Sequence, residues 1–419
     1  MMRGPWRHRD FRLIWAGGLV NDTGDWLLMV ALPAYVLVET GSGLTTALLV
    51  LAQLVPTALL GSHLGNLVDR WDLRRTVVAT NVAQAVTLLP LLAVTADRTW
   101  PAFVVAGAQS VLTRFNNPAN AALLVRVVPP AELGAANAAR AASENVARLV
   151  GSPLGGIVVA VGGLPAVVVV DGLSFLCVAL ATAAVRADAS PAPRHDEAGI
   201  DARRTAAGLR VLARTRPFPA LLATMTISQV AQGMFVVLFL VFVVRRLGGG
   251  EADVGMVRGM QAVGGILGGL LLARRLSSAP VAALLGVGFG GMAAWGFVMW
   301  NLPGLTTAIA VYAVVMALAG PFAVTCSVGV TTGAQVFPPP GYLGLGVGTL
   351  EAAGAIGQGI GALAAGVLVD RVELAWLLNG QAMPYVATAA IGWRFVRRSP
   401  DDQQRAVPGH TSVLADRAS

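Results

Sequence analysis

The chain is built from apolar runs of about 20 or more residues, each long enough to cross the hydrocarbon layer of a membrane as a helix. Hydrophobic residues make up 55% of the 419 residues before the 49 glycines are counted, and only 12% are charged. Dividing the length by roughly 35 residues per span and connection predicts about twelve crossings. The sequence therefore predicts an all-α integral membrane protein, with little room for a soluble catalytic domain.

The positions of the basic residues, all of them arginine, predict the orientation of the chain. Most arginines fall at the two ends and in alternate connections, at residues 66–75, 126–148, 186–216 and 274–275. The intervening connections are assigned only Arg98, Arg245, Arg246, Arg258 and Arg371. Because cytoplasmic connections hold the excess of basic residues, we expect a multi-pass protein of the cell inner (plasma) membrane with both termini in the cytoplasm. This placement of the charge gives no reason to expect a nucleic-acid partner.

The apolar runs divide into two halves of six spans. We expect a first bundle at residues 1–186 and a second at residues 218–398, joined by a polar cytoplasmic linker at residues 187–217. Residues 399–419 read as a disordered cytoplasmic tail. Within the linker, the pattern from Asp201 to Thr215 favours a short amphipathic helix with Leu209 and Leu212 on one side.

An internal repeat relates the two halves. A shift of about 207 residues places Phe11 on Phe218 and Glu144 on Glu351. The same shift places Asp22 and Asp25 of the first half on uncharged Gln229 and Gln232 of the second. Two membrane-embedded repeats are an architecture of secondary transporters, with the substrate site between the halves near the bilayer midplane.

The connection between the second and third spans reads G-N-L-V-D-R-W-D-L-R-R, from Gly65 to Arg75. It resembles the signature loop of the major facilitator superfamily, G-x-L-x-D-R-x-x-x-R-R, in the form found in the drug-efflux branch that includes macrolide exporters and the enterobactin exporter. The resemblance implies a gate latch in which the acid braces the neighbouring half near a helix N-terminus, formed by Gly65, Asp69, Arg70, Arg74 and Arg75. A plain positive-inside loop would explain the arginines but not Gly65 and Asp69 at this spacing.

The fifth span contains Gly151-Ser152-Pro153-Leu154-Gly155-Gly156. It resembles the antiporter motif of the same superfamily, G-P-x-x-G-G, with the proline displaced by one position. Gly151 and Gly155 let another helix approach closely, and Pro153 permits a kink. The resemblance implies export, and generic packing in a glycine-rich chain is the alternative. The likeness to the efflux branch is strong from Phe11 to Phe175 and weaker in the second half.

Two acids lie deep in the first span. Asp22 is eleven residues after Phe11, about 16 Å along a helix, which is near the midplane. A charge at that depth costs at least about 2.5 kcal/mol, so it must face a cavity, find a partner or be protonated. Arg114 of the fourth span lies at a similar depth, which predicts an ion pair with Asp22 or Asp25 that couples transport to protons. Asp25 is favoured because its Gly-Asp-Trp-Leu stretch resembles the efflux branch, and a purely structural ion pair is the alternative.

Uncharged polar residues also lie at depth. We expect a substrate cavity lined by Asn116, Asn117, Asn120, Gln229 and Gln232. For any single amide, hydrogen bonding between helices is the competing role. For Asp171, near the outer end of the sixth span, a structural cap and a role in proton access both remain open.

The residues offer no site for a metal or a cofactor. The two cysteines lie in apolar runs and the four histidines are scattered. The sequence at residues 286–291 fits G-x-G-x-x-G, but it lies inside an apolar span and not after a strand, so helix packing is the better interpretation. Without a lysine the chain has no phosphate-binding G-x-x-x-x-G-K-[ST] loop, which favours an ion gradient over ATP as the energy source.

Together these features identify the chain as a member of the major facilitator superfamily, with twelve helices in two pseudo-symmetric six-helix bundles. We expect a monomeric exporter, not an enzyme, that moves a small amphipathic compound such as a drug, an antibiotic or a siderophore in exchange for protons. A lipid flippase or a solute importer on the same fold is the closer alternative. A membrane receptor or scaffold is the more distant one, because it would not need acids at the midplane.

Overall fold

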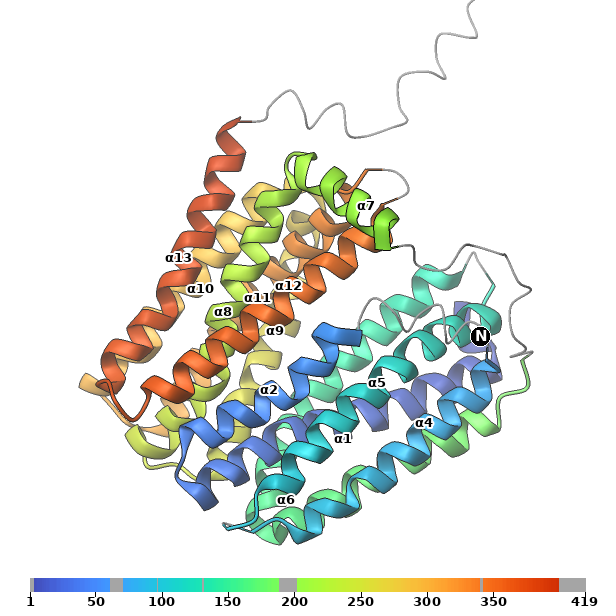
Figure 1. Cartoon of the computed structure of the whole chain (residues 1–419), viewed down its shortest axis with the longest axis horizontal. Helices are drawn as coiled ribbons and strands as arrows, with labels where there is room; N and C mark the ends of the chain where they lie inside the picture. Colours follow the sequence, from blue (N-terminus) through green and yellow to red (C-terminus); the bar gives the residue numbers. More distant parts are fainter. Residues whose placement is uncertain are drawn as a thin grey trace, which may run out of the picture.

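The computed structural model describes residues 4–60, 71–95, 97–129, 132–187, 202–339 and 342–398, and within these ranges its architecture is helical (Figure 1). The helices of the first half are α1 (Arg9–Thr40), α2 (Gly43–Leu60), α4 (Leu73–Thr87), α5 (Trp100–Val127) and α6 (Leu133–Ala183). Helix α7 (Ala202–Arg214) follows. The helices of the second half are α8 (Phe218–Val241), α9 (Glu251–Ser278), α10 (Val281–Asn301), α11 (Ile309–Val336), α12 (Leu343–Leu368) and α13 (Leu374–Arg398).

Helix α6 contains two spans that meet at Gly163. This residue has φ 61°, a left-handed conformation that glycine adopts at low cost, and Pro165 follows two residues later. If the two parts of α6 are counted separately, the described ranges hold twelve long helical segments, as the sequence predicts. The division into spans five and six is therefore confirmed. The expected connection at residues 126–148 is too long, because α6 begins at Leu133.

Three arginines that the sequence assigned to connections lie inside helices, two of them because α6 begins early. Arg140 and Arg148 lie within α6, and Arg258 lies within α9. Charge counting assigned these three to connections, although it left Arg114 inside the fourth span, because it groups arginines by their position between apolar runs and not by helix ends.

Length and hydropathy alone select seven helices of the described part as candidate membrane spans. Helices α1, α5 and α13 are long enough, at 32, 28 and 25 residues, but are not among the seven. In α1 and α5 the reason is visible in the sequence, because acids, arginines and amides interrupt the apolar run. Between them, helices α1 and α5 thus hold acids, an arginine and amides in the middle of apolar runs.

The two halves begin in the same way, as the internal repeat predicts. Phe11 at the start of α1 and Phe218 at the start of α8 are both 1% exposed. The core of the second half is the larger one and is rich in aromatic residues, including Phe235, Trp295 and Trp300, whose ring centroids lie 6.0–6.2 Å apart.

The N-terminus and the end of α6 lie together at one end of the first half. Asp10 Oδ2 accepts hydrogen bonds from the backbone N–H groups of Arg186 and Ala187, each at 2.9 Å. Arg7 donates to Glu132 at 2.6 Å, and His8 lies 3.1 Å from the other oxygen of the same carboxylate. The hydrogen bond from Arg7 is the main reason that the pKa of Glu132 lies below its usual value.

The expected linker helix is present as α7, which packs on the second half. Leu212 is 1% exposed within the core of that half, and Gly208 faces Leu345 and Tyr342 at the start of α12. Leu209, predicted to share the buried side, is 40% exposed. The predicted tail at residues 399–419 lies outside the described residues. We call the end of the molecule that holds the N-terminus and α7 the linker end.

The halves meet along two pairs of helices, α6 with α9 and α2 with α12. At the end opposite the linker end, Arg245 donates to the carbonyl oxygen of Gly41 at 2.7 Å and to Asp370 at 2.8 Å, and Gly43 faces Val369. Figure 1 shows the two bundles side by side at the lower left and diverging toward the N-terminus and α7. The chain is therefore closed at the end opposite the linker end.

Candidate functional site

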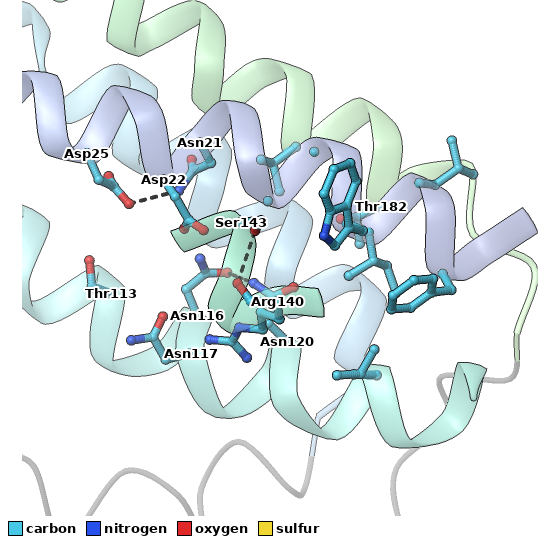
Figure 2. Close-up of a pocket in the computed structure, with 18 of the residues that line it drawn as sticks. Asn21, Asp22, Asp25, Thr113, Asn116, Asn117, Asn120, Arg140, Ser143 and Thr182 are labelled. Carbon is cyan, nitrogen blue, oxygen red and sulfur yellow. Dashed lines mark hydrogen bonds between the residues drawn. The ribbon is translucent and has the colours of Figure 1, made fainter. Parts of the chain in front are cut away.

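A cavity opens in the first half between α1, α4, α5 and α6 (Figure 2). It encloses about 830 Å³, part of it open to solvent. Asn21, Asp22 and Asp25 lie on the wall formed by α1, and Figure 2 shows Asn116 and Asn117 facing them from α5. The three amides that the sequence predicts for a substrate cavity, Asn116, Asn117 and Asn120, line this cavity together with the two acids of α1.

The two acids of α1 have different surroundings. Asp25 is exposed to the cavity, and its Oδ2 accepts a hydrogen bond from Asn21 Nδ2 at 2.9 Å. Asp22 is partly buried one turn earlier, where its charge interacts with those of Glu144 and Arg140 from α6. Among the described residues, neither acid has a cation within ion-pair distance.

The predicted ion pair of these acids with Arg114 is wrong. Arg114 pairs instead with Glu351 of α12, at 3.8 Å, and thereby joins the two halves. The physical reason is the direction of the side chain along α5: the residues of α5 that line the cavity, such as Thr113, Asn116 and Asn117, do not include Arg114. The cation that faces Asp22 is Arg140, which sequence reasoning placed in a connection.

Sequence reasoning singled out Asp171 of α6 but did not place it beside Asp25, whose charge interacts with that of Asp171. The side chain of Asp171 is 0% exposed, and its Oδ1 lies 3.3 Å from Ser174 Oγ, which donates the hydrogen bond. Asp171 Oδ2 has no partner among the described residues. A side chain at Gly24 would collide with both Asp171 and Ser174, so α1 runs directly over the buried carboxyl group. In the sequence, the glycine at position 24 was the one indication that another helix packs closely against α1 next to Asp25.

The amides of α5 form a network with α4. Asn116 Oδ1 accepts from Thr80 Oγ1 at 3.2 Å, from Asn81 Nδ2 at 3.2 Å and from Asn120 Nδ2 at 3.1 Å. Asn116 is buried, whereas Asn117 is exposed to the cavity. Asn116 therefore joins α5 to α4, Asn120 binds Asn116 within α5, and Asn117 is the most exposed amide of the three.

Gln229 and Gln232, also predicted to line the substrate cavity, lie in the second half and are not among the lining residues of this cavity. Gln229 packs against α12, where side chains at Gly354 and Gly357 would lie 3.5 and 3.4 Å from it. Gln232 accepts a hydrogen bond from the hydroxyl of Tyr385 at 3.5 Å. In this conformation both amides contact neighbouring helices of their own half.

The Gly151–Gly156 segment lies where α6 contacts both α1 and α9. A methyl group at Gly155 would lie 2.5 Å from the carbonyl oxygen of Leu27, and one at Gly151 would collide with Thr23. On its other side the segment meets the second half: Gly156 faces Glu251, and a methyl group at Gly255 would lie 2.6 Å from the carbonyl oxygen of Ser152. The glycines thus permit backbone contact both within the first half and across the two halves.

Pro153 lies in the same seam between the halves. A methyl group at Gly259 of α9 would lie 2.6 Å from Pro153 Cγ. The displaced proline of the motif therefore packs against the second half, at a glycine that leaves room for its ring.

Three residues of the predicted gate latch, Gly65, Asp69 and Arg70, lie outside the described residues. Of the remainder, Arg74 donates to the carbonyl oxygen of Ala187 at 2.8 Å, at the end of the first half. The backbone N–H of Arg75 donates to Asp72 Oδ1 at 2.8 Å, so Asp72 caps the N-terminus of α4. The latch stays a prediction.

Comparison of the sequence with known proteins identifies its family. The sequence profile of the Major Facilitator Superfamily matches residues 14–336. Macrolide efflux protein A of Streptococcus pyogenes is 26% identical over 179 residues, which is 42% of this chain and 44% of that protein. The MFS-type transporter YfiS of Bacillus subtilis is 24% identical over 161 residues, 38% of each chain. This chain therefore matches less than half the length of either relative.

Solved structures resemble this one over almost the whole chain. A nucleoside transporter, NupG, has a TM-score of 0.73 at 12% identity, over 92% of this chain and 99% of its own. A peptide transporter of the POT family has a TM-score of 0.70 at 14% identity, over 93% and 97%. A bacterial homologue of the human lysosomal transporter Spinster, in an inward-facing conformation, has a TM-score of 0.66 at 14% identity, over 92% and 94%. At these identities the likeness shows the fold alone, and together with the family profile it shows that the chain is a multi-pass membrane transporter of the Major Facilitator Superfamily.

Proposed function

We propose that this transporter is a secondary active exporter that moves a small amphipathic compound out of the cell in exchange for protons. The observation that carries the proposal is the carboxyl group of Asp25, which is exposed to a cavity at membrane depth and is not paired with a cation among the described residues. An acid in that position is costly when ionised, so it readily takes up a proton.

Asp25, Asp22 and Asp171 lie close enough for their charges to interact. Neighbouring carboxylates resist simultaneous ionisation, which favours a shared proton within the group. The side chain of Asp25 is the one exposed to the cavity, so it is the residue through which a substrate competes with the proton. Asp22 and Asn117 would contact the same substrate.

The direction of transport is inferred from two features. The Gly151–Gly156 segment resembles the antiporter motif, and the chain resembles a macrolide efflux protein over part of its length. The linker end would then face the cytoplasm, as the distribution of arginine predicts. Alternating access would proceed by rocking the two halves about the α6–α9 and α2–α12 contacts.

The test is proton movement in energised inverted membrane vesicles that contain the protein. A panel of lipophilic compounds is added to vesicles with an acidic interior, and proton release is followed with a fluorescent pH probe. Wild type is compared with Asp25→Asn and with a matched control, Glu39→Gln, which changes an exposed acid near the other end of α1.

We expect substrate-triggered proton release from the wild type and from Glu39→Gln, and none from Asp25→Asn at equal abundance. Full release from Asp25→Asn would contradict the role of Asp25. If no compound triggers release while a labelled lipid or solute still moves, the protein is a flippase or an importer and the export proposal fails.

A further inference from the structure

Two arginines lie inside helices where the halves cross. Arg148 of α6 and Arg258 of α9 are each at least about 10 Å from the nearest end of their helix, counting 1.5 Å per residue. The helices touch beside them, since a methyl group at Gly259 would lie 3.4 Å from the carbonyl oxygen of Leu149. The two guanidinium groups are near enough for their like charges to interact.

Among the described residues, neither arginine has an acid within ion-pair distance. The acid that acts on Arg148 is Glu144, one turn earlier on α6, and its charge interacts with that of Arg148 from beyond 4.0 Å. Arg148 donates to Asn145 at 2.7 Å, but its Nε is buried without a partner. The contacts that remain are with aromatic rings: Arg148 lies 5.5 Å from the centre of Trp26, and Arg258 lies 4.8 Å from the centre of Phe235.

Two neighbouring cations at membrane depth are expensive to keep without an anion. Intramembrane arginines usually pair with an acid or with carbonyl groups, or face a water-filled cavity, and they mark substrate pathways. Ring contacts offset part of the cost but do not remove the repulsion between the two positive charges. A negative group bound between them would remove it.

A cavity lies beside Arg258, between the two halves. It encloses about 410 Å³, part of it open, and its wall comes from α1, α8 and α9. The lining is apolar except for Arg258, and no acid is among the described residues that line it, which are Trp26, Met29, Val30, Pro33, Val236, Phe239, Leu240, Val254 and Arg258. The acids of α1 line the other cavity.

We propose that this cavity, which is separate from the one lined by Asp25, is a second binding site and takes an amphipathic organic anion. Its carboxylate, or a comparable monoanionic group, would lie against the guanidinium of Arg258 with Arg148 nearby, and its apolar part would fill the space beside Trp26 and Phe239. This inference goes beyond the proposed function: the substrate that competes with the proton binds at Asp25 in the other cavity, and Arg258 and Arg148 recognise a separate, anionic ligand.

The test is a binding measurement that needs no transport. The full chain in nanodiscs of phosphatidylcholine is titrated by calorimetry with three probes that share one ring system: 2-naphthoate, 2-naphthalenemethanol and 2-naphthylmethylammonium. Empty nanodiscs correct for partition into lipid. We expect saturable binding of 2-naphthoate, at least about tenfold tighter than the alcohol or the amine.

The variants are Arg258→Gln and Arg148→Gln, with Arg98→Gln in an exposed connection as the matched control. Loss of a charged hydrogen bond typically raises Kd by about 10- to 100-fold. We therefore expect the affinity for 2-naphthoate to fall by that factor in Arg258→Gln. The affinity should fall less in Arg148→Gln and should not change in the control. Binding of the alcohol should not change. If Arg258→Gln does not fold, Arg258→Lys keeps the charge and should retain the preference for the anion.

Two results would overturn the inference. One is equal binding of 2-naphthoate and the alcohol by the wild type. The other is an equal loss of both probes in Arg258→Gln together with a lower Tm, which would assign Arg258 a structural role against Phe235. Failure of the proton-release assay with intact, Arg258-dependent binding of 2-naphthoate would overturn only the proposed export function.

Discussion

The contact of Gly156 with α9 predicts how a single methyl group changes the balance between the two conformations of the transporter. In the structure, a methyl group at Gly156 would collide with the carbonyl oxygen of Glu251 and lie 3.0 Å from the Cα of Ala252, whereas ordinary contact begins at 3.4 Å. These neighbours are backbone atoms, which cannot rotate away as a side chain can. The Gly156→Ala substitution must therefore push α6 and α9 apart.

The size of the effect follows from this overlap. Overpacking by one methyl group in a tight contact costs about 1–3 kcal/mol. The cost falls on the conformation in which the end opposite the linker end is closed, because rocking of the halves separates α6 and α9 there. Since 1.4 kcal/mol is a factor of ten, the ratio of the two conformations should shift about 5- to 150-fold toward the one that opens at that end.

Distances between spin labels at Thr95 and Leu305 would measure this shift. Both residues are exposed, in connections of the first and the second half at the end opposite the linker end. The labels require a background in which Cys177 and Cys326 are replaced by serine. The closed and the open conformation of this end should give a shorter and a longer distance between the labels. In Gly156→Ala the fraction of molecules with the longer distance should increase.

The matched control is Gly172→Ala, in the second part of the same α6 helix. A methyl group there would meet only Leu88 Cδ1, at 4.0 Å, so the distribution of distances should remain that of the wild type. An unchanged distribution in Gly156→Ala, with the protein folded, would refute the argument that the glycine contact closes this end. A similar shift in both variants would refute it as well.

Three smaller effects are also expected. Arg245→Gln removes the bridge to Gly41, and because Arg245 is exposed the same distance measurement should show a shift of at most about 1 kcal/mol. Asp72→Ala removes the N-cap of α4 and should lower stability by about 1 kcal/mol, measured as a lower Tm, while Asp72→Asn should retain most of it. Because the pKa of Glu132 is lowered in the folded protein, its contact with Arg7 stabilises the N-terminal segment above pH 4.5 and is lost as the pH falls through the folded-state pKa. Hydrogen exchange of residues 4–12, corrected for intrinsic rates, should therefore become faster in the wild type over that pH range. In Glu132→Gln, which has no carboxyl group to titrate at this position, the corrected exchange rate should not show this change.

The helical fold could be predicted because its determinants, the apolar runs and an internal repeat, can be read directly from the sequence. Apolar length defines the spans, and the repeat from Phe11 to Phe218 defines the two halves. The sequence also marked Asn116 and Asn117 for the cavity wall, because amides at membrane depth seldom face lipid.

The pairing of charges could not be predicted, because it depends on which way a side chain points around its helix. Depth along the helix made Arg114 a reasonable partner for Asp25, but α5 directs Arg114 toward Glu351 of the other half. Asp171 was underrated for a related reason: its neighbour Asp25 is far away in the sequence, and only the packing of Gly24 against α6 brings the two acids together. Arginines inside helices were likewise hidden by a counting rule that applies to connections.

The seam between α6 and α9 consists largely of main-chain atoms that meet at glycines, at Gly156, Gly255 and Gly259. Main-chain contacts of this kind do not titrate, and salt does not screen them. A change of pH or of salt concentration therefore does not act directly on these main-chain contacts. Such a change can act on the seam only through the ionisable groups beside it, which include Arg148 of α6 and Arg258 of α9.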